Sequence, residues 1–155
     1  MFERIREWLD ENDVAYRHVH HAPTPTSEDS ARERGESIDV GGKALLVKAG
    51  EQFRLVVLSA ALRLDSKSLR RELGERQIRF ATRDELLELT GLVPGSVPPF
   101  GEPILPFPLH VDESTLANDR IAFNAGSLTD SLILSIEDYR RVTTIESVVR
   151  VGRPA

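Results

Sequence analysis

One lysine stands at the start of a run of apolar residues. Lys43 follows Gly41-Gly42 and precedes the unbroken run Ala44–Val47, a pattern typical of a strand that is covered on both faces. A lysine at the lip of such a strand can present its ammonium to a cavity while its aliphatic stem packs against apolar neighbours. Lysines at strand ends are more commonly solvated, so position alone leaves both interpretations open.

Two segments rich in small or rigid residues could complement such a cation. Gly91–Gly101 is dense in glycine and proline and poor in charge, which favours a stiff loop that a ligand can approach closely. Backbone N–H groups of such a loop can hold a carbonyl oxygen or an oxyanion. Asn124–Thr129 places further small residues between two expected strands, where Gly126 suits a ligand contact. A plain turn is the alternative for both segments.

The histidines near the N-terminus raise the question of a metal. His18 and His20 are two residues apart, so in an extended chain they point to the same side and could share an ion. No carboxylate or further ligand has a supporting spacing. We therefore favour hydrogen-bonded or solvated histidines and expect no metal and no other cofactor.

Composition narrows the class of protein. The chain has 155 residues, 40% of them hydrophobic and 29% charged, which predicts one globular domain over residues 1–155. The absence of cysteine excludes disulfides and thiolate nucleophiles. A net charge of −5 argues against a strongly basic nucleic-acid binder but leaves a local basic patch open. No apolar run approaches the ~20 residues of a membrane helix, and the charged N-terminus is unlike a signal peptide. We expect a cytoplasmic protein.

Periodicity and turn chemistry predict the elements that position these residues. Helices are expected at 2–12, from Thr26 or Ser27 to Arg34, from Asp65 to Gly74 and from Thr82 to Gly91, with a brief helical turn after Ser135. Strands are expected at 14–19, 43–48, 53–60, 104–111, 121–124, 131–136 and 145–151. Strands dominate, and helices do not alternate with them regularly. This order predicts an α+β fold with a mixed or largely antiparallel central sheet and surrounding helices.

Four segments in this order resemble a known family. They are Lys43–Val47, Arg63–Lys67, Leu89–Gly91 followed by Gly95–Gly101, and Ala125–Ser127. Together they are similar to the YbaK/EbsC family, which includes the editing domain of bacterial prolyl-tRNA synthetase and its free-standing relatives. The resemblance runs from about Val14 to Tyr139, and the element Gly-x-Val-Pro-Pro-Phe-Gly is its most specific part.

The resemblance implies an aminoacyl-tRNA deacylase, which hydrolyses the ester of a tRNA charged with the wrong amino acid. Such correction is needed because one methylene in an apolar pocket discriminates by only ~1–3 kcal/mol. Lys43 matches the key lysine of the family, which implies that it orients the aminoacyl-adenosine end through a phosphate or carbonyl oxygen, a bond worth ~1.5–3 kcal/mol. The resemblance also implies that there is no protein nucleophile and that hydrolysis relies on a positioned water, backbone donors and the terminal ribose hydroxyl.

The resemblance also implies a set of substrate-binding residues and partners. The residues are Thr24, Thr26, Pro99, Phe100, Gly101, Gly126 and Ser127. At 124–127 this chain departs from relatives that carry a histidine or an arginine there, so the amino acid that it edits stays open. The implied partner is aminoacyl-tRNA, and a synthetase or elongation factor is a further candidate. The resemblance implies no membrane association and a monomeric protein. Two alternatives are a non-catalytic module that binds an aminoacyl or nucleotide-like ligand, and a hydrolase of small aminoacyl esters.

Overall fold

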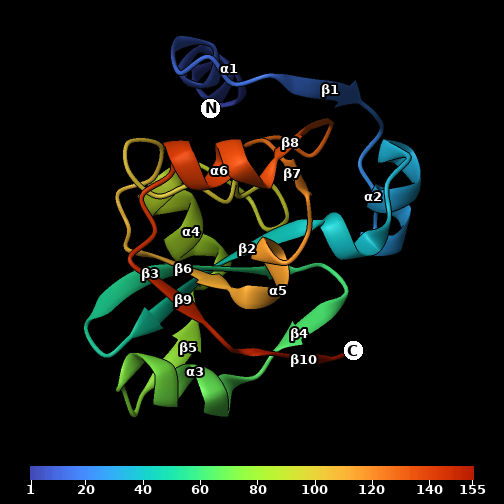
Figure 1. The fold of residues 1–155 in the computed structure, drawn as a ribbon. Helices are drawn as coiled ribbons and strands as arrows, with labels where there is room; N and C mark the ends of the chain where they lie inside the picture. Colours follow the sequence, from blue (N-terminus) through green and yellow to red (C-terminus); the bar gives the residue numbers. More distant parts are fainter.

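The computed structural model describes all residues from 1 to 155. Two sheets are stacked, with α1 above the smaller sheet and α3 below the larger one (Figure 1). In chain order the elements are α1 (Phe2–Glu11), β1 (Tyr16–His20), α2 (Ser27–Arg34), the 3-10 turn η1 (Ile38–Val40), β2 (Gly42–Ala49), β3 (Gln52–Ser59), β4 (Leu62–Leu64), α3 (Ser66–Leu73), β5 (Ile78–Phe80), α4 (Arg83–Thr90), β6 (Leu109–Asp112), α5 (Glu113–Leu116), β7 (Arg120–Asn124), β8 (Asp130–Ser135), α6 (Ile136–Val142), β9 (Ser147–Val149) and β10 (Gly152–Pro154).

The larger sheet is mixed. Its five strands run in the order β5-β2-β3-β6-β9, with β2 antiparallel to both β3 and β5. The pairs β3–β6 and β6–β9 are parallel. A second, antiparallel sheet has the order β1-β8-β7, and β4 and β10 form a separate ribbon. The α+β fold with a mixed sheet that the sequence predicts is therefore confirmed.

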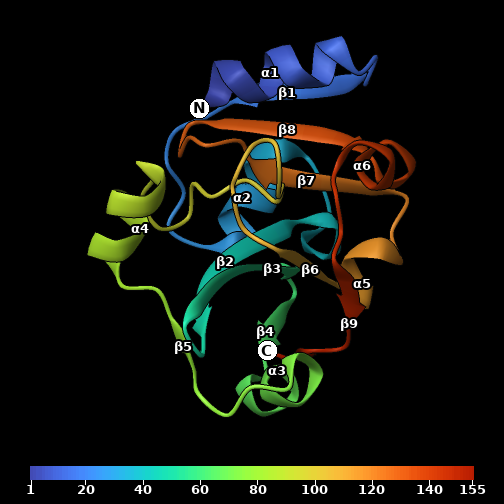
Figure 2. The ribbon, with the colours of Figure 1, turned by 90° about the vertical axis from the view of Figure 1, so that its left-hand side faces the viewer.

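The main core lies between the two sheets, and a smaller one lies between the larger sheet and α3 (Figure 2). Side chains alternate across a strand, so Leu46 of β2 enters the main core whereas Val47 meets Leu69 of α3 in the smaller one. Lys43 shares the parity of Val47. Its side chain therefore leaves β2 on the face of α3, β4 and β10.

The glycine- and proline-rich segment is anchored by aromatic packing. Phe100 is fully buried, and its ring lies 5.0 Å from Trp8, 5.2 Å from Phe123 and 5.6 Å from Tyr139, measured between centroids. Edge-to-face pairs of this kind contribute about 0.5–1.5 kcal/mol each beyond the burial of their area. The segment is thus joined to α1, β7 and α6.

Helix ends follow the predicted caps. The side chain of Thr26 accepts a hydrogen bond from the Asp29 N–H at the start of α2, and Thr82 and Glu85 form a reciprocal capping box at the start of α4. Helices α2, α3 and α4 each end at a glycine with positive φ, at positions 35, 74 and 91.

Two predicted strands are wrong in extent. Within 104–111 only Leu109 onward is a strand, because Pro106 and Pro108 have no N–H to give to a ladder. The N–H groups of Ile104 and Leu105 instead bond the carbonyl of Gly101 in a turn. Within 145–151 only Ser147–Val149 (β9) is a strand, and β10 follows outside that range and joins a different sheet.

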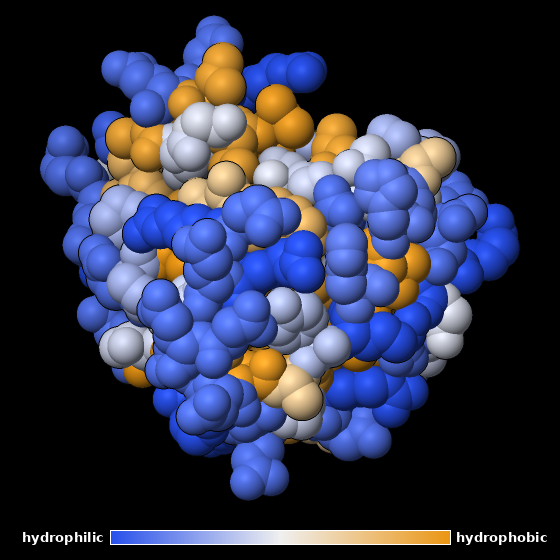
Figure 3. Space-filling view, turned by 90° about the horizontal axis from the view of Figure 1, so that it is seen from above, coloured by the Kyte–Doolittle hydropathy of each residue, from blue (hydrophilic) through white to orange (hydrophobic).

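The surface seen from the side of α1 is mainly hydrophilic, with apolar residues gathered toward one edge (Figure 3). The exposed large apolar side chains of the whole chain are Phe80, Leu87, Leu89, Leu128 and Val148. No helix combines the length and the apolar character that crossing a bilayer requires.

Candidate functional site

Lys43 is a half-buried cation near the start of β2. Its Nζ donates a hydrogen bond to the main-chain carbonyl of Leu62 in β4. Burial, and after it the neighbouring charge of Arg63, lowers the pKa of Lys43 below its ordinary value. No carboxylate is among the groups that shift this pKa. The ammonium therefore has a fixed position and no neutralising partner.

A buried carboxylate holds the ribbon that presents the Leu62 carbonyl. Asp112 Oδ1 accepts hydrogen bonds from the N–H groups of Val151 at 2.6 Å and Gly152 at 3.0 Å, and its Oδ2 accepts from the Ser114 N–H at 3.0 Å. Strand β10 then pairs with β4 in antiparallel register. A backbone group with several fixed neighbours is a more precise support for Lys43 than a mobile side chain would be.

The two glycines before Lys43 let the chain pass through a narrow gap. A Cβ on Gly42 would stand 2.6 Å from Ile121 Cδ1, and a Cβ on Gly41 would stand 2.8 Å from Ala60 Cβ. Neither distance leaves room for a methyl group. The start of β2 is therefore pressed against β7 on one side and the turn between β3 and β4 on the other.

Arg34 is a second cation close to this gap, at the end of α2. It is only 7% exposed, and burial lowers the pKa of its guanidinium to about 10. Its Nε donates to Ser131 Oγ at 2.9 Å, and its Nη2 donates to Asn124 Oδ1 at 3.1 Å. The guanidinium thus joins the end of α2 to strands β7 and β8.

Asn124 connects Arg34 to the glycine- and proline-rich segment. Its Oδ1 accepts from Arg34 and from Ser131 Oγ, while its Nδ2 donates to the Gly95 carbonyl at 2.8 Å. Every hydrogen-bonding end of this amide group therefore has a protein partner. The predicted loop at Gly91–Gly101 and the predicted turn at Asn124–Thr129 are brought together here.

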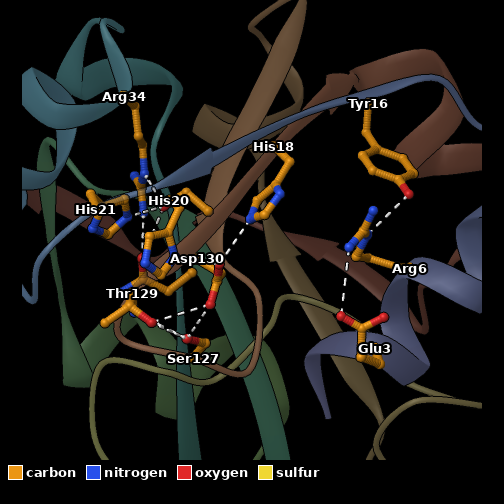
Figure 4. A network of polar contacts seen from close by, with 12 residues as sticks. Glu3, Arg6, Tyr16, His18, His20, His21, Arg34, Ser127, Thr129 and Asp130 are labelled. Atoms are coloured by element: carbon orange, nitrogen blue, oxygen red, sulfur yellow. Dashed lines mark hydrogen bonds and ion pairs between the residues drawn. The ribbon is translucent and has the colours of Figure 1, made fainter.

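Asp130 gathers a polar cluster beside the same turn (Figure 4). Its Oδ1 lies 2.8 Å from His18 Nε2 and 2.9 Å from His20 Nδ1. Its Oδ2 accepts hydrogen bonds from Ser127 Oγ at 3.0 Å and Thr129 Oγ1 at 3.1 Å. Burial alone would raise the pKa of Asp130, but the hydrogen bonds from the two histidines, Ser127 and Thr129 outweigh it and hold this pKa well below its usual range.

The two histidines do lie on one side of β1, as their spacing predicts, and both face one carboxylate oxygen. The chain contains no group of three or more histidine or acidic side chains arranged to hold a metal ion. His21, next in the chain, is buried instead and bonds Ser131 Oγ through Nε2 at 2.8 Å. The histidines thus belong to a hydrogen-bonded network.

Of the predicted substrate-binding residues, Ser127 belongs to this network and Gly126 precedes it in the chain, while Thr24 and Thr26 make their contacts at the start of α2. Thr24 Oγ1 is hydrogen-bonded to Ser30 Oγ, and Thr26 caps α2. Ser127 accepts the Thr129 N–H at 3.0 Å in addition to its bond with Asp130. Gly126 has φ of 71°, and a Cβ there would collide with the side chain of Met1.

The other three predicted residues are packed into the core. Pro99 accepts a hydrogen bond through its carbonyl from the Tyr139 hydroxyl at 2.6 Å. Phe100 is enclosed by aromatic rings, and a Cβ on Gly101 would stand 3.2 Å from the Phe107 carbonyl oxygen. No hydrogen bond links these residues to Lys43. Their role in binding substrate stays a prediction.

Arg34 was not among the predicted site residues, and its neighbour Arg32 is of the same type. Residue type and helix position do not separate the two arginines, because both lie in the last turn of α2. In the structure Arg32 is exposed and pairs with Asp29 at 2.9 Å, whereas Arg34 is buried without a carboxylate. The spacing of the two residues, which puts them on different sides of a helix, was the one available signal.

Comparison with known proteins places this geometry in a family. The aminoacyl-tRNA editing domain family matches residues 21–142. The chain belongs to this family.

Individual relatives agree with that assignment. The Multifunctional Ser/Thr-tRNA deacylase ProXp-y of Escherichia coli is 33% identical over 157 aligned positions, which cover 94% of this chain and 90% of the relative. The Prolyl-tRNA editing protein ProX of Acetoanaerobium sticklandii is 27% identical and covers 86% of this chain and 85% of its own length.

Solved structures share the fold. The crystal structure of a hypothetical protein, 26% identical, superposes with a TM-score of 0.84 and covers 97% of this chain and 99% of that chain. A second crystal structure, of a protein put forward as a trans-editing enzyme for prolyl tRNA synthetase, is 24% identical with a TM-score of 0.84. It covers 97% of this chain and 96% of that chain, and at this identity the likeness shows the fold alone.

Proposed function

We propose that this protein is a free-standing aminoacyl-tRNA deacylase that hydrolyses the ester of a mischarged tRNA, with Lys43 orienting the aminoacyl-adenosine end. The observation that carries this proposal is the state of Lys43, a half-buried ammonium held by a main-chain carbonyl and by no carboxylate. Membership of the editing-domain family supports the reaction class. The names of the two relatives support a tRNA ester as the substrate.

The reaction needs a water molecule and a stabilised carbonyl oxygen. Water attacks the ester carbonyl carbon, the bond to the ribose oxygen breaks, and the products are the free amino acid and a tRNA with an intact terminal ribose. An ammonium has three N–H donors, and Leu62 engages one of those of Lys43. The remaining two can donate to the oxygen on which negative charge develops, or to a neighbouring phosphate.

Side-chain hydroxyls near the site are already engaged. Ser127 Oγ is bonded to Asp130, and Thr24 Oγ1 to Ser30. Neither hydroxyl has a histidine in its hydrogen bonds, so neither is set up as an activated nucleophile. Ser131 Oγ does lie 2.8 Å from His21 Nε2, but the hydroxyl donates its proton to Asn124 Oδ1, so the histidine is not placed to accept that proton. This supports direct attack by water, assisted by backbone donors and by the ribose hydroxyl of the substrate.

The remaining predicted residues take supporting roles in this proposal. Gly126 and Ser127 line the amino-acid side of the site, and Thr24 and Thr26 border it from the start of α2. Pro99–Gly101 acts as a rigid wall through its packing against the core. The protein works in the cytoplasm as a monomer, and a synthetase or an elongation factor delivers the tRNA.

Deacylation assays on a panel of mischarged tRNAs test the proposal. The panel starts with tRNAs carrying serine, threonine and other small amino acids. Wild type should clear at least one of them, and Lys43→Ala should lower kcat/KM by about 10- to 150-fold, the equivalent of one charge-assisted hydrogen bond. Lys48→Ala is the matched control, because Lys48 lies on the same strand with its ammonium 5.7 Å from the centre of the Phe53 ring.

Each outcome separates a part of the proposal. If wild type clears no member of the panel, the deacylase assignment fails. If Lys43→Ala is as active as wild type, deacylation stands but the role of Lys43 is wrong. Tight binding of an aminoacyl-tRNA without hydrolysis would favour the alternative, a non-catalytic module that binds an aminoacyl or nucleotide-like ligand.

A further inference from the structure

Arg34 is a buried charge that the structure does not neutralise. Its side chain belongs to a residue that is only 7% exposed, and burial is the sole cause of its lowered pKa, with no carboxylate contributing. Removing an ion from water without a partner is expensive. A neutral glutamine could supply N–H donors to Ser131 and Asn124 at lower cost. The positive charge of Arg34 therefore needs a reason beyond those two bonds.

One nitrogen of the guanidinium is open. Nε and Nη2 have protein acceptors, but Nη1 donates no hydrogen bond. The fully buried polar side-chain atoms without a partner belong to Arg54, Thr115 and Thr143. Because Arg34 is absent from that group, Nη1 reaches solvent. A guanidinium has five N–H donors, so those of Nη1 remain free for a ligand.

This open nitrogen lies beside the start of β2. A Cβ on Gly41 would stand 3.6 Å from Nη1. Gly41 is two residues before Lys43, and side chains two apart point to the same side of an extended chain, roughly 6.6 Å from each other. A Cβ on Gly41 would also stand 2.8 Å from Ala60 Cβ and 3.2 Å from the Ile38 carbonyl oxygen, so only glycine fits at this crowded point beside Nη1. Arg34 Nη1 and the Lys43 side chain therefore lie on the same side of residues 41–43.

We propose that Arg34 Nη1 is an anion-binding site for a phosphate group, and that in the deacylation proposed above it holds the phosphodiester of the terminal nucleotide next to Lys43. The choice of phosphate follows from the substrate. An amino acid esterified to ribose has no free α-carboxylate, and its amino group would be repelled by a guanidinium. The anions of an aminoacyl-tRNA end are its phosphates, and arginine matches them in geometry as well as in charge.

Binding of adenosine 5′-monophosphate compared with adenosine tests this site directly. The two probes differ by one phosphate, so the ratio of their affinities, measured by calorimetry at one salt concentration, reports the anion contact. Wild type should prefer adenosine 5′-monophosphate by about tenfold or more. Arg34→Gln should abolish this preference and leave the affinity for adenosine unchanged. Arg32→Gln removes the same charge from the same helix at an exposed position and should keep the preference.

A second measurement does not depend on a variant that folds. In wild-type protein the Arg34 side-chain N–H resonances should shift on titration with adenosine 5′-monophosphate and stay in place with adenosine. Wild type without a preference for the phosphate, an Arg34→Gln protein that keeps it, or resonances that do not respond would each overturn the assignment.

The outcome is separable from that of the deacylase proposal. If no mischarged tRNA is cleared but the phosphate preference depends on Arg34, the anion site stands without the activity. If a tRNA is cleared and Arg34→Gln binds both probes as wild type does, the activity stands without the anion site.

Discussion

The crowding at Gly42 gives a sharp test of how Lys43 is positioned. A methyl group there would stand 2.6 Å from Ile121 Cδ1 and 2.8 Å from Ile121 Cγ1, whereas carbon atoms in good contact are about 3.5–4.0 Å apart. Ile121 is fully buried, so it cannot turn away freely. Overpacking of this kind costs about 1–3 kcal/mol, and each kcal/mol lowers Tm by about 2–4 °C in a chain of this size. We expect Gly42→Ala to lower Tm by roughly 2–12 °C.

A double-mutant cycle isolates the contact. Ile121→Val removes Cδ1, the nearer of the two atoms, and costs about 0.5–1.5 kcal/mol by itself. In the double variant the loss should be smaller than the sum of the single losses by at least about 0.5 kcal/mol. Urea unfolding followed by the fluorescence of Trp8 gives the four free energies of unfolding. Strictly additive losses, or a Gly42→Ala protein as stable as wild type, would refute the close approach of β2 to β7.

Three further predictions concern charge and hydrogen bonding. Arg63→Gln should raise the pKa of Lys43, because the charge of Arg63 lowers it in the wild type. The pH at which deprotonation of Lys43 reduces kcat/KM for deacylation should therefore move upward. An unchanged pH for this loss, after correction for uncatalysed hydrolysis, would contradict the prediction. The pKa of Asp130 is lower in the folded protein than its unfolded value of 3.8, so the stability it contributes is present above that value and is lost as pH falls below it. The difference in the free energy of unfolding between wild type and Asp130→Asn, measured in urea, should therefore shrink between about pH 5 and about pH 3. Tyr139→Phe leaves the Pro99 carbonyl without its partner and should cost about 1–3 kcal/mol in urea unfolding; a loss below about 0.5 kcal/mol would count against a net contribution from this bond.

Local rules were sufficient for most helix boundaries. Thr82 followed by Glu85 specifies a helix start by two short-range hydrogen bonds, and both can be read from four consecutive residues. The same is true of the glycines that end α2, α3 and α4. The identity of β2 and β3 followed from their apolar runs. These features need no knowledge of distant parts of the chain.

Tertiary contacts decided what the sequence could not show. Whether Arg34 is solvated or buried depends on strands β7 and β8, which lie about 90 residues further along the chain. The carboxylate of Asp130 finds His18 and His20 across 112 and 110 positions. The face on which Lys43 emerges is set by the packing of the two sheets. Such pairings have no local signature, so residue type alone left Lys43 and the two histidines with two interpretations each and did not single out Arg34 or Asp130.

Charge placement suggests how an acidic protein can hold the end of a tRNA. The net charge of −5 opposes long-range attraction of a polyanion, so the cations must act at contact distance. Arg63 faces Arg153 directly in the β4–β10 register, an arrangement that destabilises a strand pair unless an anion lies between the charges. Arg153 has the Asp65 carboxylate within electrostatic reach, whereas no carboxylate shifts the pKa of Lys43 or Arg34. If these cations contact about two or three phosphates of a single-stranded end, the logarithm of the association constant should fall with the logarithm of the salt concentration with a slope of about −1.4 to −2.1. A slope several times steeper would require contacts along the tRNA body and would refute binding through Lys43, Arg34, Arg63 and Arg153 alone.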